Sequence, residues 1–336
     1  MSRTRRLVLL LAAVTAVGLV ATGCAGGTET GAGGETKLKI AAVFSGSTTD
    51  ADYNSLGLLA LEEAKKKGAE TAYSESVAVP DVERVMKEYL ADGYTVIWSH
   101  GSQFYEATAK LAKQNPDVTF IAEFDDKPAD QPDNLWVIDR NFHVGFYPIG
   151  TLAAAATKTG KIGYVGGLSL PFSYSEVHAM RQALKDAGST AEIIPVWTGD
   201  FNDPAKAQQI TSQLMSQGAD VIVGSLNLGM VGAFQATKDK PAGSVWITAK
   251  YTDKSQFDPQ HYATSVIYDF VKPLDDILSK IKEGARSGYY PLGFDTGVQI
   301  QEPKNLPAEV TEKVNAVVAD VKSGKITVEK NLTAIK

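Results

Sequence analysis

The sequence contains very few of the residues that build redox and metal sites. It has one cysteine and four histidines in 336 residues, and the histidines are scattered with no His-Glu-x-x-His motif. A single cysteine cannot close an internal disulfide bond, and this residue set does not predict a zinc site. The sequence also lacks the G-x-S-x-G, G-x-x-x-x-G-K-[ST] and G-x-G-x-x-G motifs. We therefore expect no serine-hydrolase centre, no nucleotide-phosphate loop, no metal and no cofactor.

One pair of carboxylates, Asp125 and Asp126, has the composition of a catalytic pair. Neighbouring residues in an extended chain point to opposite sides, so two adjacent aspartates rarely share a proton. A polar loop after a strand is the favoured interpretation of this pair. Nothing else in the sequence argues for an enzyme, and we expect none.

The only cysteine, Cys24, follows features of a secreted lipoprotein. Three arginines precede an apolar run over residues 7–21, which has the length of a signal-peptide core and is short for a membrane span. The segment Leu19-Val20-Ala21-Thr22-Gly23-Cys24 resembles a bacterial lipobox. This resemblance implies lipidation of the Cys24 sulfur and cleavage before it. An ordinary secretory signal and an uncleaved anchor are the alternatives.

Residues 24–36 are rich in glycine and threonine, a composition typical of a flexible tether. We therefore expect the mature protein on the extracytoplasmic face of the cell membrane, held there by lipid chains on Cys24. Removal of the three N-terminal arginines changes the formal net charge from −6 to −9. A nucleic-acid partner is excluded on this ground, because phosphate contacts need a basic surface.

The remaining chain of about 300 residues alternates between short apolar runs and segments with helical spacing of apolar residues. This alternation predicts parallel sheets flanked by helices, and the length suits two lobes joined near residues 144–150. Glycines after the helices, as in KKKGAE and MSQGADVI, are typical helix C-caps. The expected strands are 39–44, 71–77, 95–99, 119–124, 161–165, 191–197 and 221–224. The expected helices are 54–67, 82–92, 105–114, 174–188 and 205–218.

Polar and aromatic residues gather directly after the expected strands. Ligands of open α/β sheets bind outside the carboxyl ends of the strands, so these residues are candidates for ligand contact. A mixture of rings and hydrogen-bonding groups suits a flat polar ligand. The candidates on this basis are Asp52, Tyr53, Asn54, His100, Gly101, Phe104, Asp125, Phe172, Trp197 and Asn227.

Some of these aromatic residues have a second interpretation as ordinary core. Core packing is favoured for Trp197, as it is for Phe44 and Phe124. Ligand contact and core packing are equally open for Tyr53, Phe104 and Phe172. We hypothesise that Tyr53 in the first lobe and Phe172 in the second lobe hold a planar base between them.

Several segments resemble the basic membrane lipoprotein family, the substrate-binding lipoproteins of ABC importers for purines or purine nucleosides. The resemblance covers nearly all of residues 39–284. Its most specific part is residues 157–167, TKTGKIGYVGG, and further parts are Asp52-Tyr53-Asn54, residues 92–104, NPDVTF at 115–120, and FNDPAK with QGADVI at 201–206 and 217–222. The family implies a two-lobed type I periplasmic-binding-protein fold with a hinge between the lobes.

The sequence departs from this family at the expected sugar contacts. The family's ribose-binding aspartate aligns with Lys250, although Asp253 could supply a carboxylate after a change of register. The family's lysine after the returning strand is replaced by Tyr268 or Asp269. An ammonium group only donates hydrogen bonds, so these changes favour a free purine base over the matching nucleoside.

We therefore expect a monomeric, lipid-anchored solute-binding protein that delivers a small polar ligand, a purine base or nucleoside, to an ABC permease. A ligand-sensing or regulatory surface lipoprotein of the same fold is the alternative. The effector domain of a transcription factor is disfavoured by the lipobox. The expected parts are a signal peptide (1–23), a tether (24–36), lobe 1 (37–145), lobe 2 (146–264), a return to lobe 1 (265–284), and a strand and helix near the hinge (285–336).

Overall fold

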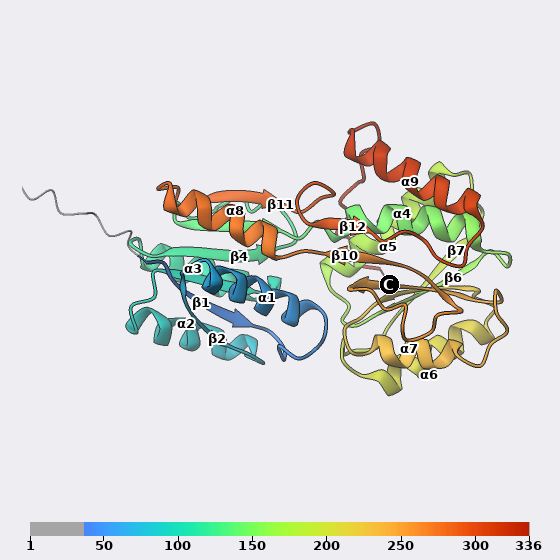
Figure 1. Ribbon diagram of the computed structural model, residues 1–336, viewed down its shortest axis with the longest axis horizontal. Coiled ribbons are helices and arrows are strands. Elements are labelled where there is room, and N and C mark those ends of the chain that lie inside the picture. Colours follow the sequence, from blue (N-terminus) through green and yellow to red (C-terminus); the bar gives the residue numbers. More distant parts are fainter. Residues whose placement is uncertain (1–36, 336) are drawn as a thin grey trace, which may run out of the picture. The chain divides into compact units, whose positions relative to one another are not determined.

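A computed structural model describes residues 37–335 of the chain. The expected signal peptide and tether, with Cys24, lie outside the described residues. Two six-stranded sheets organise the described part (Figure 1). No helix between residues 37 and 335 is long and apolar enough to cross a membrane.

The first sheet has the strand order β11-β5-β4-β3-β1-β2, and all of its neighbouring strands are parallel. Its apolar residues alternate between two faces: Ile40, Ala42 and Phe44 pack on one side, and Ala41 and Val43 pack on the other. Both faces are therefore buried under helices. The elements are β1 (Lys39–Phe44), α1 (Tyr53–Lys66), β2 (Glu70–Ser74), α2 (Val82–Ala91), β3 (Val96–His100), α3 (Tyr105–Gln114), β4 (Thr119–Phe124), β5 (Leu135–Asp139), α8 (Val271–Lys282) and β11 (Gly288–Pro291), with short 3-10 turns at Val79–Asp81 and Ser102–Phe104.

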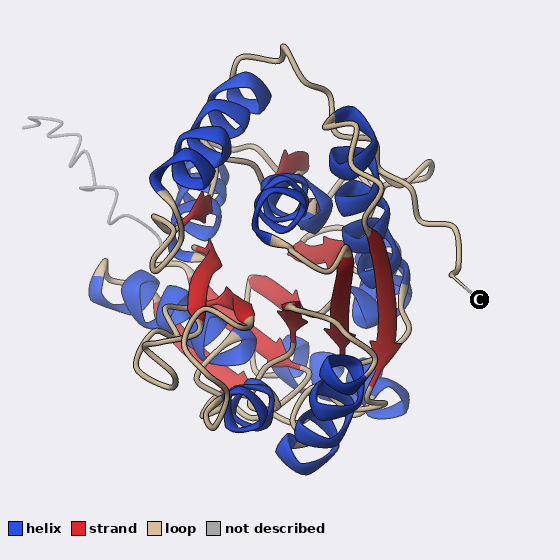
Figure 2. Ribbon diagram, turned by 90° about the vertical axis from the view of Figure 1, so that its right-hand side faces the viewer, coloured by secondary structure: helices blue, strands red, loops and turns tan. Residues whose placement is uncertain are grey.

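The second sheet has the order β12-β10-β9-β8-β6-β7, in which β12 alone runs antiparallel to its neighbour. Helices again surround the strands, as Figure 2 shows from this side. The elements are α4 (Phe142–Ala156), β6 (Lys161–Gly166), α5 (Pro171–Asp186), β7 (Glu192–Trp197), α6 (Pro204–Ser216), β8 (Val221–Ser225), α7 (Met230–Thr237), β9 (Trp246–Tyr251), β10 (Tyr262–Tyr268), β12 (Val298–Ile300) and α9 (Ala308–Lys322).

The chain passes between the two sheets three times: after β5, after β10 and after β11. The return to the first lobe follows Tyr268, four residues later than expected, because β10 pairs with β9 in the second sheet up to Ile267. The expected join at residues 144–150 lies inside helix α4, which packs against α5. A β-carbon on Gly150 would lie only 2.7 Å from the Met180 backbone, so this glycine allows the two helices to approach closely.

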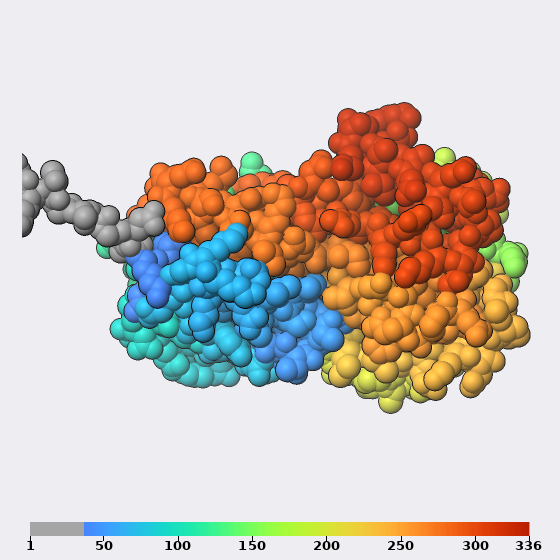
Figure 3. All heavy atoms as spheres, viewed as in Figure 1, coloured from blue at the N-terminus to red at the C-terminus, as the bar shows by residue number. Residues whose placement is uncertain are grey.

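The C-terminal part of the chain contributes to both lobes. Helix α8 packs on α1 in the first lobe, while α9 packs on α4. Figure 3 shows these late residues, coloured orange to red, over both halves of the described chain. Residues 323–335, which we call the C-terminal strap, then run along α5, where Gln182 binds the backbone of Thr327 and Glu329. Lys330 of the strap forms an ion pair with the buried Asp139 at the end of β5.

Candidate functional site

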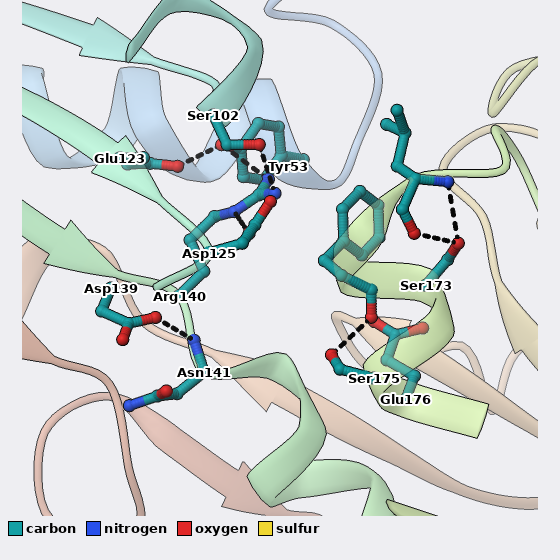
Figure 4. Close-up of polar contacts among 12 residues, drawn as sticks. Tyr53, Ser102, Glu123, Asp125, Asp139, Arg140, Asn141, Ser173, Ser175 and Glu176 are labelled. Atoms are coloured by element: carbon teal, nitrogen blue, oxygen red, sulfur yellow. Dashed lines mark hydrogen bonds and ion pairs between the residues drawn. The ribbon is translucent and has the colours of Figure 1, made fainter. Parts of the chain in front are cut away.

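The carboxyl ends of both sheets bring polar and aromatic side chains together at the interface between the lobes. The first lobe contributes the start of α1, the ends of β3 and β4, and the segment after β5. The second lobe contributes the start of α5 and the segments after β8 and β9. Figure 4 shows part of this arrangement, with Arg140, Asp125 and Ser102 facing Ser173 and Glu176 of α5.

Tyr53, at the first position of α1, is fixed by a buried cluster. Its ring stacks on His100 with 4.0 Å between the ring centroids, and its hydroxyl donates to Glu123 at the end of β4. The His100 Nε2 atom lies 2.9 Å from the Tyr53 carbonyl oxygen, which can only accept, so Nε2 donates this bond, while Nδ1 of the same ring faces the buried Glu123 carboxylate. Burial, together with Glu123, raises the pKa of Tyr53 well above its usual value. Tyr53 therefore remains a neutral hydroxyl donor.

A glycine in α1 makes this cluster possible. A β-carbon on Gly57 would lie 2.7 Å from the Phe44 ring and 2.8 Å from His100 Nε2. Any larger residue would push α1 away from the sheet and separate Tyr53 from His100.

Arg140, two residues before α4, places its guanidinium between the lobes. Its Nε and Nη2 atoms donate to Asp125 Oδ1 at 2.8 and 2.6 Å, and Nη2 also donates to Ser102 Oγ at 2.7 Å. Ser102 is preceded by Gly101, whose φ of 146° strains any other residue. The Arg140 Cζ atom lies 4.7 Å from the Phe172 ring centroid in the second lobe and 5.8 Å from the Tyr53 ring centroid in the first. The guanidinium therefore lies near both rings of the hypothesised base-binding pair.

Lys250, in β9, is engaged within the second lobe. Its Nζ atom lies 2.6 Å from Glu176 Oε1, and the hydroxyl of Tyr164 donates to the other Glu176 oxygen at 2.6 Å. Both charged side chains are fully buried, and Nζ lies 3.5 Å from the Phe142 ring centroid. Burial lowers the pKa of Lys250 to about 8, against the raising effect of Glu176. This lysine is therefore not a free group awaiting a ligand.

Contacts between the two lobes cluster around the loop that precedes α1. Asp52 forms an ion pair with Lys254 and accepts from Thr252 Oγ1 at 3.0 Å, both from the segment after β9. Asn227 Nδ2 donates to Asp50 Oδ2 at 3.3 Å. Burial raises the pKa of Asp52 to about 7, against the lowering effect of Lys254. We call these contacts the inter-lobe latch, and their presence means that the structure has the lobes closed on each other.

The rim of the second lobe is also aromatic. Phe172 is buried, stacks on Phe201 at 6.0 Å and meets Phe142 edge-on at 5.5 Å. Trp197 is half-buried, and its indole nitrogen donates to Ser173 Oγ at 3.0 Å. Trp197 therefore supports the first turn of α5, which positions Phe172.

Three predicted residues do not contact Arg140, Phe172 or Lys250. Phe104 is fully buried in the separate core beneath α2 and α3, because its 3-10 turn directs it into the sheet face. Asp253 is exposed and accepts from the backbone of Ser255 and from Gln301. Asn54 is held by the Asp50 carboxylate as part of the loop before α1. In the closed arrangement these three side chains are therefore engaged with other groups of the protein. Tyr268 is also buried, and it packs edge-on against Phe142 behind Lys250.

The sequence interpretation missed several residues of the site. Arg140 and Phe142 follow β5, which was not among the expected strands, and Glu123 lies inside a strand. Glu176 lies within a helix, where an isolated carboxylate is usually exposed. Lys254 was not among the candidates, although its neighbour Asp253 was. For Arg140, the same strand-end rule applied to residues 135–139 would have found it.

The site is closed in this arrangement. Tyr53 and Phe172 are only 6 % and 5 % exposed. A surface hollow of about 740 Å³ lies elsewhere, beside α3, and contains none of the candidate ligand residues. A ligand therefore enters the inter-lobe site only when the lobes separate. Among residues 37–335, no group of three or more histidine, cysteine, aspartate or glutamate side chains is arranged to hold a metal ion.

Comparison with known proteins identifies the family. Residues 37–332 match the family model described as ABC transporter substrate-binding protein PnrA-like. The chain belongs to this family. The expected family and the expected role, substrate binding for an ABC transporter, are therefore confirmed, and transport is supported over the sensing alternative. Proteins of this class act on the extracytoplasmic side of the membrane.

Individual relatives agree with the family assignment. An ABC transporter nucleoside-binding protein of Lactococcus lactis is 26 % identical over 96 % of this chain and 99 % of its own. A purine-binding protein of Brucella abortus is 25 % identical over 87 % of this chain and 83 % of its own. The structure of an ABC transporter solute-binding protein from Conexibacter woesei has a TM-score of 0.69 at 25 % identity, covering 88 % of this chain and 99 % of that chain. The expected two-lobed periplasmic-binding-protein fold is thus confirmed.

Proposed function

We propose that this protein is the lipid-anchored receptor of an ABC importer, and that it captures a purine base between its lobes. The observation that carries the proposal is the position of Arg140 between the lobes, with the ring of Phe172 only 4.7 Å from its guanidinium. Lobe closure brings cationic and aromatic groups of both lobes together, which suits a flat polar ligand. The purine- and nucleoside-binding relatives support the ligand class.

The latch supports a mechanism of capture by closure. Asp52 and Asp50 of the first lobe contact Lys254 and Asn227 of the second, and these contacts are lost when the lobes separate. A ligand that touches both lobes favours the closed state, because it binds that state more tightly than the open one. The closed monomer then docks on its permease and releases the ligand.

Within the purines, we propose that the free base is preferred to the nucleoside. Lys250 aligns with the position at which the family resemblance implies a ribose-binding aspartate, and it is bonded to Glu176. Asp253, the alternative carboxylate, is exposed and bonded to Gln301. Neither residue offers a free carboxylate to sugar hydroxyls, each such bond being worth about 1.5–3 kcal/mol.

The ligand proposal is tested by extraction and titration. Mass spectrometry of small molecules released from the purified protein is expected to find a stoichiometric purine. Titration calorimetry with hypoxanthine, guanine, adenine and their nucleosides is expected to favour each base. A nucleoside that binds more than about tenfold tighter than its base would contradict the preference for the base.

The stacking role of the rings is tested by truncation. Base–aromatic stacking is worth about 1–3 kcal/mol, so Phe172→Ala and Tyr53→Ala are each expected to weaken purine binding roughly tenfold or more. Phe257→Ala is the matched control, because Phe257 is 39 % exposed and outside the site. Wild-type affinity in both Phe172→Ala and Tyr53→Ala would refute the proposed stacking.

The anchor is tested separately. We propose that Cys24 carries the lipid after removal of residues 1–23, as the lipobox implies. Cys24→Ser is expected to yield soluble or unprocessed protein that no longer partitions into detergent. Unchanged partitioning of this variant would remove the lipoprotein assignment and leave the ligand proposal intact.

A further inference from the structure

The guanidinium of Arg140 is held rigidly on one side. Three of its N–H groups are used: Nε–H and one Nη2–H donate to Asp125, and the other Nη2–H donates to Ser102. The Arg140 side chain is only 4 % exposed. Because the guanidinium is planar, a buried guanidinium held by these three bonds points its remaining N–H groups in a fixed direction.

The remaining donors belong to Nη1, and they are poorly used. Within the described residues, the hydrogen bond of Nη1 is to Tyr53 Oη at 3.5 Å, the outer limit for such a bond. The Tyr53 hydroxyl itself donates to Glu123. A buried donor without a good partner is costly, so Nη1 is a group that a ligand can satisfy.

The surroundings of Nη1 define the shape of that ligand. The Phe142 and Phe172 ring centroids lie 4.8 and 4.7 Å from Arg140 Cζ, so in the closed arrangement the guanidinium covers the Phe172 face that points towards the first lobe. The other cations at this interface, Lys250 and Lys254, are each bonded to a carboxylate. When the lobes separate, this Phe172 face becomes available to a planar ring. The edge of a ring stacked there meets the two N–H donors of Nη1, while the carboxylates of these two pairs stay bonded to their lysines.

We propose that Arg140 selects 6-oxopurines over 6-aminopurines, a proposal that rests on the purine ligand proposed above. A 6-oxopurine offers two adjacent acceptors, the O6 carbonyl oxygen and N7, and arginine pairs with these two atoms of guanine in nucleic-acid recognition. Adenine places an amino donor where O6 would be. The adenine amino group and the Arg140 Nη1 group are then both donors, so one Nη1 hydrogen has no acceptor.

The test compares two bases of similar size in the wild-type protein. Titration calorimetry is expected to show hypoxanthine binding roughly 5- to 150-fold tighter than adenine, the discrimination typical of a bidentate arginine. Adenine binding as tightly as hypoxanthine would overturn the role of Arg140 while the purine proposal stands. Binding of neither base would overturn both.

A variant pair tests the Nη1 donors. Arg140→Met removes these donors, so the hypoxanthine preference is expected to fall to less than about threefold. Arg181→Met, on the exposed face of α5, is the matched control and is expected to keep the full preference. Circular dichroism confirms that each variant is folded. Retention of the full preference in folded Arg140→Met would overturn the inference.

Discussion

Replacement of Lys250 tests the buried ion pair of the second lobe. Lys250→Met keeps the length of the side chain and removes its charge, so Glu176 remains buried with Tyr164 as its partner. Removing one partner of a buried pair costs about 3–5 kcal/mol, because the other charge is left uncompensated. The double variant Lys250→Met/Glu176→Gln removes both charges and leaves an amide that still accepts from Tyr164. Most of the lost free energy of unfolding is therefore expected to return.

Urea unfolding followed by circular dichroism measures these free energies. In a separate thermal unfolding experiment, the single variant is expected to have a melting temperature lower by at least about 6 °C, at roughly 2–4 °C per kcal/mol for a large domain. Lys272→Met is the control, since Lys272 pairs with Asp276 on the exposed face of α8 and its loss is expected to leave stability unchanged. Two results would refute this account of the pair. One is a Lys250→Met variant whose free energy of unfolding is less than about 1 kcal/mol below the wild-type value, and the other is a double variant no more stable than the single one.

Three further changes probe a buried histidine of α4, the latch and the packing of α1. Burial lowers the pKa of His143 to about 3, below its value of 6.5 in the unfolded chain, so the contribution of this residue to the free energy of unfolding is expected to fall by up to about 1.4 kcal/mol per pH unit as pH drops from 6.5 towards 3. Asp52, whose raised pKa acts with the opposite sign over the same range, is present in both proteins, so urea titrations at pH 7 and 5 are compared between the wild type and His143→Gln, and only the wild type is expected to show the His143 contribution. Asp52→Asn removes the ion pair with Lys254 and is expected to weaken ligand binding by at least about fivefold through a smaller closed fraction, whereas unchanged calorimetric affinity would show that the latch is not used. Gly57→Ala is expected to lower the free energy of unfolding, measured in urea, by about 1–3 kcal/mol. An unchanged free energy would mean that α1 can move away from the sheet without loss of stability.

Local pattern predicted the regular elements of the fold well. The expected helix at 205–218 and strand at 221–224 match α6 (Pro204–Ser216) and β8 (Val221–Ser225) closely, because apolar spacing and C-cap glycines define them within one segment. Helix α4 was missed because it is apolar on all sides and contains Gly145, Pro148 and Gly150. The strands β11 and β12 are only four and three residues long, and they exist through pairing with β5 and β10 far away in the sequence.

The site was predictable only in part, for a related reason. The rule that ligands bind after strand ends predicted Tyr53, Asp125 and Phe172, and the structure places all three around the guanidinium of Arg140. The partners that decide what these groups do are distant in sequence: Glu176 is 74 residues from Lys250, and Lys254 is 202 residues from Asp52. No local pattern encodes such pairs, so the sequence alone does not reveal that Lys250 is bonded to Glu176.

The position of β11 has a consequence for how the protein is made. The first sheet takes its edge strand from residues 288–291, which are synthesised after the five strands β6 to β10 of the second sheet. During synthesis or export, the first lobe therefore exposes the edge of β5 until nearly the whole chain has emerged. An exposed edge strand pairs readily with other chains. A chain that stalls before residue 288 is thus expected to leave an incomplete, aggregation-prone first lobe, however well its second lobe has folded.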